Sequence, residues 1–423
     1  MKSHEISKFN LTLSERRIVT LAGLGGMLEF YDFIIYGIFS LYFANQFFPS
    51  SVALMSIMAS YLVFILGYIT RPIGGIIFSH IGDEYGRKQV LVITIVLMGL
   101  ASLLIGILPT YQQIGIAAPI LLISLRLLQG LAIGGELPST YVYVTESITH
   151  KSGTAFGTVM GLTVFGLLIG MLLNVLLTTW LNLQQLTDYG WRVPFILGGA
   201  LCLVSYKIRK TLHETTAFSK ITKKSKFPLF DLLKNYPSQV LVATALTATL
   251  AASIIIFVVF MPTYLGKIVT LEVGTTSHMM VWVILVVIFS SLIMGRISNH
   301  FAPTILLKFV LILEIMLVGP SYYFISHHIY ILLCLFTLGV LTGALSALVP
   351  AIISTLFPAQ VRLSGVALSY NLGFSIFGGL APVIITLCIK NGANIYLVPV
   401  IYIWIICLLA LFGLMFMNKI DES

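Results

Sequence analysis

Apolar segments of about 20 residues recur from one end of the chain to the other, each bounded by proline, glycine or charge. A segment of that length crosses the hydrocarbon core of a bilayer as a helix. Helices are required because lipid offers no hydrogen-bond partner to the backbone. The predicted spans are 18–43, 55–81, 89–108, 118–143, 153–179, 193–209, 239–262, 278–298, 304–325, 329–349, 365–388 and 395–417. The sequence therefore predicts an all-α polytopic membrane protein with twelve transmembrane helices.

The composition excludes a water-soluble protein, because 58% of the 423 residues are hydrophobic and only 9% are charged. The first span is not predicted to be a cleaved signal peptide, since a long polar leader precedes it and no small-residue cleavage site follows. The cysteines all lie inside predicted spans, where we expect them to act as small apolar residues: Cys202, Cys334, Cys388 and Cys407.

The basic residues gather in alternate loops. With the N-terminus inside, the cytoplasmic segments hold Lys2, Lys8, Arg16, Arg17, Arg87, Lys88, Lys151, eight basic residues from Lys207 to Lys234, Arg296, Lys308, Arg362 and Lys419. The other side receives only Arg192, Lys267 and Lys390. This bias predicts that both termini are cytoplasmic. It also explains the net charge of +9 through loops that face anionic lipid, so no nucleic-acid partner is expected.

The longest charged stretch, residues 206–237, lies midway along the chain and separates six spans from six. We expect an N-terminal six-helix bundle over 1–205, a cytoplasmic linker over 206–237 and a C-terminal six-helix bundle over 238–423. The linker is predicted to carry a short interfacial helix at 228–235, and its basic residues are expected to contact lipid headgroups.

The two halves share landmarks in matching helices. Asp83 matches Asn299 at an offset of 216, and Pro138 with Ser152 match Pro350 with Ser364 at an offset of 212. Three landmarks at nearly one offset indicate a tandem duplication. Such an architecture supports alternating access by rocking of the two repeats.

Four blocks carry a family resemblance. They are "GGMLEFYDFIIYG", "RPIGGIIFSHIGDEYGRK", "RLLQGLAIGGE" and "LFPAQVRLSGVALSYNLGFSIFGGLAP". Together they resemble the metabolite:proton symporter branch of the major facilitator superfamily, which includes proline/betaine, citrate, 2-oxoglutarate and shikimate carriers. The resemblance implies two six-helix bundles in a bacterial inner membrane. One departure is Asn299, which stands where the family has an acid, so the charge relay at the cytoplasmic gate is expected to be weaker in the second half.

Two carboxylates, Glu29 and Asp32, interrupt the first span three residues apart. Residues at that spacing share one side of a helix. A charge at mid-depth costs about 3 kcal/mol, so both are expected to face the bundle interior. Arg126 lies at similar depth in the fourth span, which the resemblance places beside the first. We therefore predict an Asp32–Arg126 pair as the proton-coupling site, with Glu29 beside it. The alternative is a static ion pair that only fixes helix packing.

A second predicted pair joins Arg71 to Glu136 on the cytoplasmic side, in a gating or structural role. The resemblance assigns Asp83, Arg87 and Glu146 to a cytoplasmic gate network. Exposed ion pairs add little stability, so these residues are expected to bias the inward against the outward state.

Substrate binding is predicted at Arg126, Tyr31, Tyr36, Tyr370 and Asn371, which the family blocks contain. Aromatic rings could hold an ammonium group by cation–π attraction. Ordinary interior packing is the alternative for each tyrosine.

Charge counting favours a zwitterionic substrate. Inside the spans the ionisable residues are the acids Glu29, Asp32, Glu136 and Glu314 and the cations Arg71 and Arg126. A zwitterion needs one cation with acidic or aromatic surroundings, whereas a di- or trianion needs more. Glu314 lies mid-span in the ninth helix, which the resemblance places on the periphery; it is expected to be paired or snorkelling, and a part in proton coupling is the alternative.

The resulting prediction is a proton-coupled symporter that imports a small zwitterion such as proline or glycine betaine. The alternatives are proton symport of a mono-, di- or tricarboxylate and a non-transporting sensor on the same fold. An enzyme is not expected, because the chain has no metal-ligand cluster or nucleophile elbow, and no phosphate loop indicates ATP use. The expected partners are the substrate, protons and lipid, with no cofactor and no obligate protein partner.

Overall fold

The computed structural model describes residues 11–50, 53–148, 150–221 and 227–420. The helices of the first half are α2 (Leu13–Phe47), α3 (Ala53–Glu84), α4 (Arg87–Ile107), α5 (Tyr111–Ile114), α6 (Ala117–Ser147), α7 (Ser152–Trp180), α8 (Leu183–Gln185), η1 (Leu186–Gly190) and α9 (Arg192–Arg209). The linker carries α10 (Thr216–Ser219) and α11 (Pro228–Asn235). The second half contains α12 (Pro237–Ile254), η2 (Ile255–Val259), α13 (Met261–Thr263), η3 (Tyr264–Ile268), α14 (Val273–Ile297), α15 (Pro303–Ser326), α16 (Ile331–Ile353), α17 (Arg362–Leu372), η4 (Gly373–Gly378), α18 (Ala381–Lys390) and α19 (Leu397–Ile420).

The prediction of a polytopic helical membrane protein is confirmed. Eleven helical segments of the described chain are long and apolar enough to cross a membrane, and α8–η1 with α9, bent by 41°, make a twelfth. Helix α2 begins earlier than predicted because a capping box stabilises its start. Glu15 N–H bonds to Thr12 Oγ1, and Glu15 Oε2 accepts the Thr12 N–H at 2.8 Å. Its 35 residues extend over about 52 Å, so its ends project beyond the hydrocarbon core.

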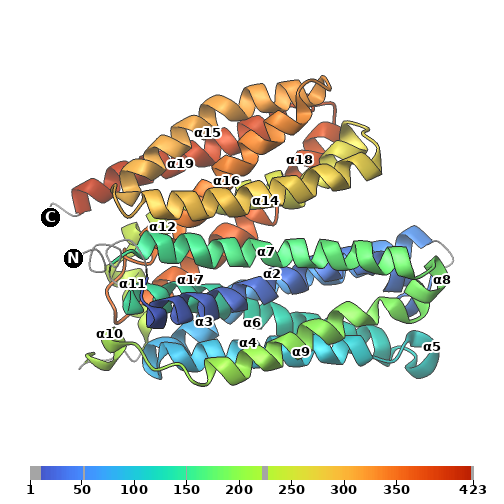
Figure 1. Cartoon of the computed structure of the whole chain (residues 1–423), viewed down its shortest axis with the longest axis horizontal. Coiled ribbons are helices and arrows are strands. Elements are labelled where there is room, and N and C mark those ends of the chain that lie inside the picture. Colours follow the sequence, from blue (N-terminus) through green and yellow to red (C-terminus); the bar gives the residue numbers. More distant parts are fainter. Residues whose placement is uncertain (1–10, 51–52, 149, 222–226, 421–423) are drawn as a thin grey trace.

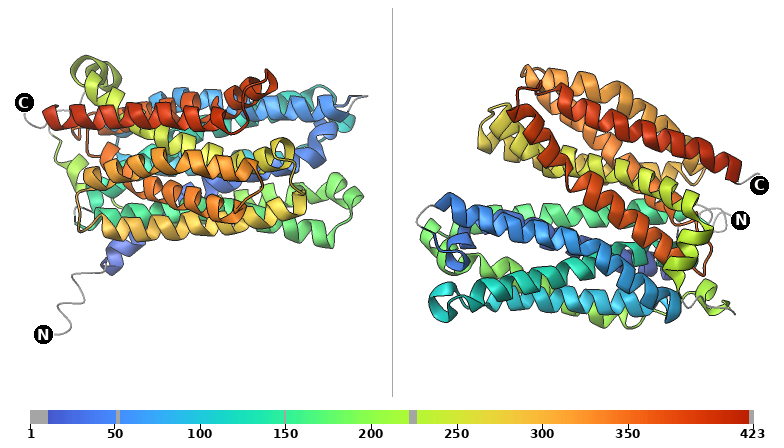
Figure 2. Two further views of the ribbon diagram at one scale, coloured as in Figure 1. Left: turned by 90° about the horizontal axis from the view of Figure 1, so that it is seen from above. Right: turned by 180° about the vertical axis from the view of Figure 1, so that it is seen from behind.

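Two bundles stack against each other (Figure 1). Helices α7 and α14 meet at one side of the interface, where the backbones are so close that a Cβ on Gly295 would lie 2.8 Å from the Cα of Gly157. On the other side, α17 reaches across to pack on α3 (Figure 2). Two spans of the second bundle are interrupted by π-helical turns, η2 after α12 and η4 after α17. Such turns are frequent at functional sites.

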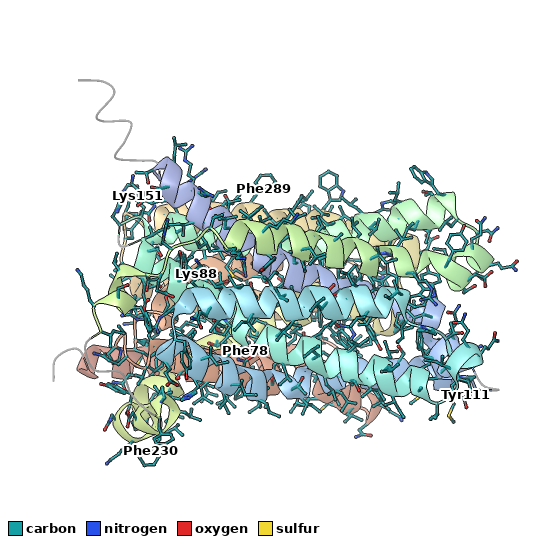
Figure 3. All side chains as sticks on the ribbon, turned by 90° about the horizontal axis from the view of Figure 1, so that it is seen from below. Phe78, Lys88, Tyr111, Lys151, Phe230 and Phe289 are labelled. Atoms are coloured by element: carbon teal, nitrogen blue, oxygen red, sulfur yellow. The ribbon has the colours of Figure 1, made fainter. Side chains whose placement is uncertain are left out.

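The ends of the molecule differ in character. The start of α2, the end of α19 and the linker helices lie at one end, with α5 and α8 at the other (Figure 1). Figure 3 shows Lys88, Lys151 and Phe230 near the first end and Tyr111 at the opposite one. The predicted linker helix at 228–235 is confirmed as α11. Its Phe230 and Leu233 are exposed, as expected of a helix that lies in a membrane interface.

Candidate functional site

A small cavity lies between the two bundles. It is lined by Glu29, Phe30, Phe33, Phe64, Gly67, Tyr68, Arg71, Arg126, Gln129, Gly130, Ile133, Leu167, Ile254, Ile255, Val259 and Phe374. These residues come from α2, α3, α6 and α7 on one side and from α12, η2 and η4 on the other. A largely apolar and aromatic cavity with a few convergent charges is the usual form of a small-molecule site.

The predicted direct pair between Asp32 and Arg126 is replaced by a bridge. Gln129 donates from Nε2 to Asp32 Oδ2 at 2.8 Å, and its Oε1 accepts from Arg126 Nη1 at 2.8 Å. Ser102 donates a second, short hydrogen bond to the same oxygen of Asp32. Sequence reasoning missed Gln129 and Ser102 because neutral polar residues inside a span carry no charge signal. The side-chain amide of Gln129 therefore links Asp32 to Arg126 by one hydrogen bond to each.

Arg126 packs on an aromatic ring, and two of its nitrogens lack hydrogen-bond acceptors in the described structure. Its guanidinium carbon lies 3.4 Å from the centroid of the Tyr36 ring, a stacked cation–π arrangement. Its Nε and Nη2 are buried and find no hydrogen-bond acceptor among the described residues. Buried donors normally have partners, so these two N–H groups are suited to an acceptor carried by a ligand.

Glu29 and Arg71 form the second charged group of the cavity. Glu29 Oε1 lies 3.5 Å from Arg71 Nη2. The Arg71 guanidinium also lies 5.2 Å from the Tyr68 ring and 5.3 Å from the Phe374 ring. The pair therefore joins α2 to α3, and Arg71 also contacts η4 of the second bundle through the Phe374 ring.

An aromatic cluster of Phe33, Phe64 and Tyr68 stands beside these charges. The ring centroids are 4.8 Å apart for Phe33 and Phe64, and 5.4 Å apart for Phe33 and Tyr68. All three line the cavity. Ring faces arranged in this way attract an organic cation.

Three other predicted substrate residues, Tyr31, Tyr36 and Tyr370, are not among the residues that line the cavity in the described structure. The hydroxyl of Tyr31 donates to Pro194 O at 2.8 Å, and that of Tyr36 donates to Ser60 O at 3.3 Å. Tyr370 packs on Phe374, with ring centroids 4.5 Å apart. These contacts position helices or cavity residues, and Tyr36 supports Arg126 directly.

Asn371 instead joins the two bundles. Its Nδ2 donates at 2.8 Å to Gly134 O on α6 and to Ala367 O within α17. The structure therefore gives this amide a contact across the bundle interface rather than a place in the cavity lining.

The predicted pair of Arg71 with Glu136 is wrong. Glu136 Oε1 lies 2.6 Å from Arg209 Nη1, and its Oε2 accepts from Thr94 Oγ1 at 2.5 Å. Arg209 is fully buried and also donates to Leu91 O at 2.9 Å. Sequence reasoning counted Arg209 among the cytoplasmic basic residues, although the predicted span 193–209 ends on it. Helix α9 ends at Arg209 as that span predicts, and the side chain is buried in the bundle. The pair locks α6 to α9 inside the first bundle.

The predicted network of Asp83, Arg87 and Glu146 comes together. Arg87 Nη1 lies 3.2 Å from Asp83 Oδ1, and Arg87 Nη2 lies 3.2 Å from Glu146 Oε1. The second bundle joins in, because Arg362 Nη1 lies 3.1 Å from Glu146 Oε1 and Ser364 donates to Asp83 Oδ2 from both N (2.9 Å) and Oγ (2.8 Å). Asp83 thus accepts from the first turn of α17, a favourable place for an anion. The network ties the bundles together at the end that carries the linker.

The linker adds residues that the sequence reading missed. Glu214 accepts the backbone N–H groups of Arg87 and Lys88, at 3.1 and 3.2 Å, and so caps α4. Thr215 donates to Glu146 Oε2 at 2.5 Å. The sequence signal that could have indicated them is an acid followed by a threonine, Glu214-Thr215, a few residues after the basic residues at the end of span six.

The second half carries a neutral counterpart of Asp83. Asn299 Oδ1 accepts the Thr154 N–H of α7 at 3.3 Å, and Asn299 Nδ2 donates to Thr154 Oγ1 at 2.5 Å. The duplication is therefore visible in the contacts, since each matched residue reaches the start of a helix in the other bundle.

Among the described residues, no group of three or more His, Cys, Asp or Glu could hold a metal ion.

Comparison with known proteins gives three findings. The sequence model of the Major Facilitator Superfamily matches residues 22–382. The chain is 28% identical over 419 residues to the glycine betaine/proline/ectoine/pipecolic acid transporter OusA of Dickeya dadantii (96% of this chain, 83% of that protein) and 26% identical over 417 residues to the proline/betaine transporter of Escherichia coli K12 (94% and 82%). The fold is similar to that of the proton:xylose symporter XylE bound to 6-bromo-6-deoxy-D-glucose, with a TM-score of 0.77, 15% identity and coverage of 96% and 95%.

Proposed function

Because the chain belongs to the major facilitator superfamily and is a membrane transporter rather than an enzyme, we propose that it imports a small zwitterion such as proline or glycine betaine by proton symport. The observation that carries this proposal is the content of the cavity. Arg126 presents two N–H groups that lack acceptors within the described structure, beside an aromatic cluster and Glu29. The two relatives described above, a glycine betaine/proline/ectoine/pipecolic acid transporter and a proline/betaine transporter, act on compounds of this class.

Each end of a zwitterion has a counterpart in the cavity. The substrate carboxylate would accept from Nε and Nη2 of Arg126, since a guanidinium offers a planar pair of donors to a carboxylate. The ammonium group would lie against Phe33, Phe64 and Tyr68, where ring faces attract a cation that has left water. The unpartnered Oε2 of Glu29 adds negative charge on the same side. Proline and glycine betaine both combine a carboxylate with a compact ammonium group.

Proton coupling would run through the amide bridge. A substrate carboxylate at Arg126 competes for the positive charge that Gln129 now relays to Asp32. An ionised carboxyl group with a weakened counter-charge in a dry interior is costly, so Asp32 would bind a proton as substrate binds. Its Oδ1 has no hydrogen-bond partner among the described residues and is the free position for that proton. The substrate and the proton would then be released to the cytoplasm when the network around Asp83 opens.

The proposed setting is a bacterial inner membrane with both termini in the cytoplasm. The end of the molecule that carries the linker and the gate network would then be the inner one. The bonds of that network close this end, so the arrangement described corresponds to a transporter that is shut toward the cytoplasm.

A dicarboxylate is the second candidate, favoured by one observation. The cavity contains two guanidinium groups, since Arg71 lines it together with Arg126. Protonation of Glu29 would free Arg71 for a second carboxylate.

The test is uptake into liposomes loaded with a pH-sensitive dye, with proline, glycine betaine, 2-oxoglutarate, citrate and shikimate offered one at a time. We expect proline or glycine betaine to acidify the lumen, and Asp32→Asn to abolish the acidification. The matched control is Asp188→Asn, which alters an exposed acid outside the cavity. Acidification that survives in Asp32→Asn would refute the coupling site, and acidification by dicarboxylates alone would establish the second candidate.

A further inference from the structure

Glu314 stands in the middle of α15 and is fully buried. The sequence predicted a peripheral helix whose acid is paired or snorkelling, with proton coupling as the alternative. Helix α15 packs on α16 and α19, in agreement with a peripheral helix, but the Glu314 side chain is buried and does not snorkel. Its Oε1 accepts from Ser253 Oγ of α12 at 2.7 Å, and its Oε2 accepts from Cys407 Sγ of α19 at 3.5 Å. No Lys, Arg or His within the described residues forms an ion pair with it.

The hydrogen bonds around Glu314 suit a carboxyl group that gains and loses a proton. Ser253 has one hydroxyl proton, yet its Oγ lies within bonding distance of both Glu314 Oε1 and Thr249 O, the latter at 2.9 Å. When Glu314 is protonated, it can donate to Ser253 Oγ while Ser253 donates to Thr249 O. When Glu314 is ionised, Ser253 must turn its proton away from Thr249. An ionised carboxylate without a cation is costly in such a place.

The helices packed on α15 supply few other titratable groups. Helix α12 carries none, α16 carries Cys334, α19 carries Tyr402, Cys407 and Lys419, and α15 itself carries Lys308, Tyr322 and Tyr323. Of these, only Cys407 bonds to Glu314 in the described structure. The protonation of Glu314 therefore depends on hydroxyl and thiol donors that reorient, rather than on a fixed counter-ion.

Ser253 connects this site to the cavity. The next residues, Ile254 and Ile255, line the cavity together with Val259, and the helix changes there from α12 to the π-helical turn η2. The same turn of backbone thus contacts Glu314 on one face and the substrate cavity on the other. A change in the hydrogen bond between Ser253 and Thr249 acts on the last turn before this break.

We propose that Glu314 is a second proton-binding site, located in the C-terminal bundle, and that Ser253 passes its protonation state to the cavity wall formed by α12 and η2. Its part in the transport cycle rests on the proposed symport, whereas the binding of a proton there does not.

The proton site is tested by infrared difference spectroscopy of the purified full-length protein in lipid during a pH titration. We expect a carbonyl stretch from a protonated, buried carboxyl group that is absent in Glu314→Gln and shifted in frequency in Ser253→Ala. Asp188→Asn, an exposed acid, should leave the band unchanged. Spectra of wild type and Glu314→Gln that agree at every pH would overturn the proposal. If Glu314→Gln does not fold, an unshifted band in Ser253→Ala would overturn it equally.

The link to the cavity is tested by the pH dependence of glycine betaine and proline binding. We expect the wild-type affinity to change several-fold between acidic and alkaline pH, and Glu314→Gln to reduce this change to the part that Asp32 contributes. An unchanged pH profile in Glu314→Gln would refute the link. Absence of binding by either compound would refute the proposed substrate and the link through it, while the infrared result still decides the proton site.

Discussion

The contacts of Asp83 and Asn299 between the two bundles allow a quantitative comparison of a charged and a neutral residue at matched positions. Asp83→Ala removes an acceptor that reaches across the interface to the first turn of α17, and Asn299→Ala removes its neutral counterpart at α7. Both substitutions truncate a side chain at a matched position of the duplicated fold. They differ in the charge and burial of the group, since Asp83 is 2% exposed and Asn299 is exposed.

The expected magnitudes follow from the bonds. Asp83 accepts two short hydrogen bonds from Ser364, at 2.8 and 2.9 Å. Bonds to a charged group contribute about 1.5–3 kcal/mol each, so the two contribute about 3–6 kcal/mol to the closed state. Even the lower value corresponds to about a hundredfold change in the ratio of closed to open molecules. Asn299 makes two neutral bonds at an exposed position, which at about 0.5–1.5 kcal/mol each contribute about 1–3 kcal/mol. The lower value corresponds to about a fivefold change.

The ratio can be measured from distances between spin labels at two exposed positions on opposite bundles, Gln89 and Phe301, in a background without the native cysteines. We expect Asp83→Ala to populate the long, open distance strongly and Asn299→Ala to do so weakly. Equal shifts in the two variants, or none in Asp83→Ala, would refute the argument that the charged half holds the gate.

Three further outcomes are expected. Arg209→Met leaves the buried Glu136 without its cation and should destabilise the protein by about 3–5 kcal/mol. Adding Glu136→Leu to that variant should restore much of the lost stability. Thermal unfolding in detergent measures both, and equal stability of the single and double variants would contradict this account of the pair. Gln129→Leu removes the amide bridge and, at about 1.5–3 kcal/mol for one bond to a charged group, should lower proton-coupled uptake at least about tenfold, while uptake equal to wild type would contradict the relay. Phe230→Trp and Leu233→Trp on α11 should show fluorescence quenched by brominated lipid in nanodiscs, and unquenched emission would place that helix away from the membrane.

Local rules explain what could be predicted. The bilayer imposes one length on every span, so the apolar runs located the helices to within a few residues; the predicted 118–143, for instance, lies within α6. Asp83 and Arg87 meet because they are only four residues apart, on the two sides of the short turn through Gly86 (φ 119°) that joins the end of α3 to the start of α4. The helix α11 was likewise predictable, because a proline start and an amphipathic pattern define it locally.

The partners of the buried charges could not be predicted in the same way. Position along a span gives a depth in the membrane, but several residues at one depth point in different directions around the helix. Which of them meet depends on the rotation and tilt of neighbouring helices, and those are set by packing. The sequence therefore placed Arg71 near Glu136, whereas helix packing gave Arg71 to Glu29 and Glu136 to Arg209.

The same limit applies to the cavity and to the surroundings of Glu314. The apolar runs and the motifs were enough to predict a transporter with twelve spans and with acids at mid-depth in spans one and nine. Only the tertiary structure decided that Gln129 stands between Asp32 and Arg126, and that Glu314 lies in the interior without a cation. The physical reason is that hydrophobic length is a property of each segment, whereas the environment of a buried charge is a property of all the segments around it.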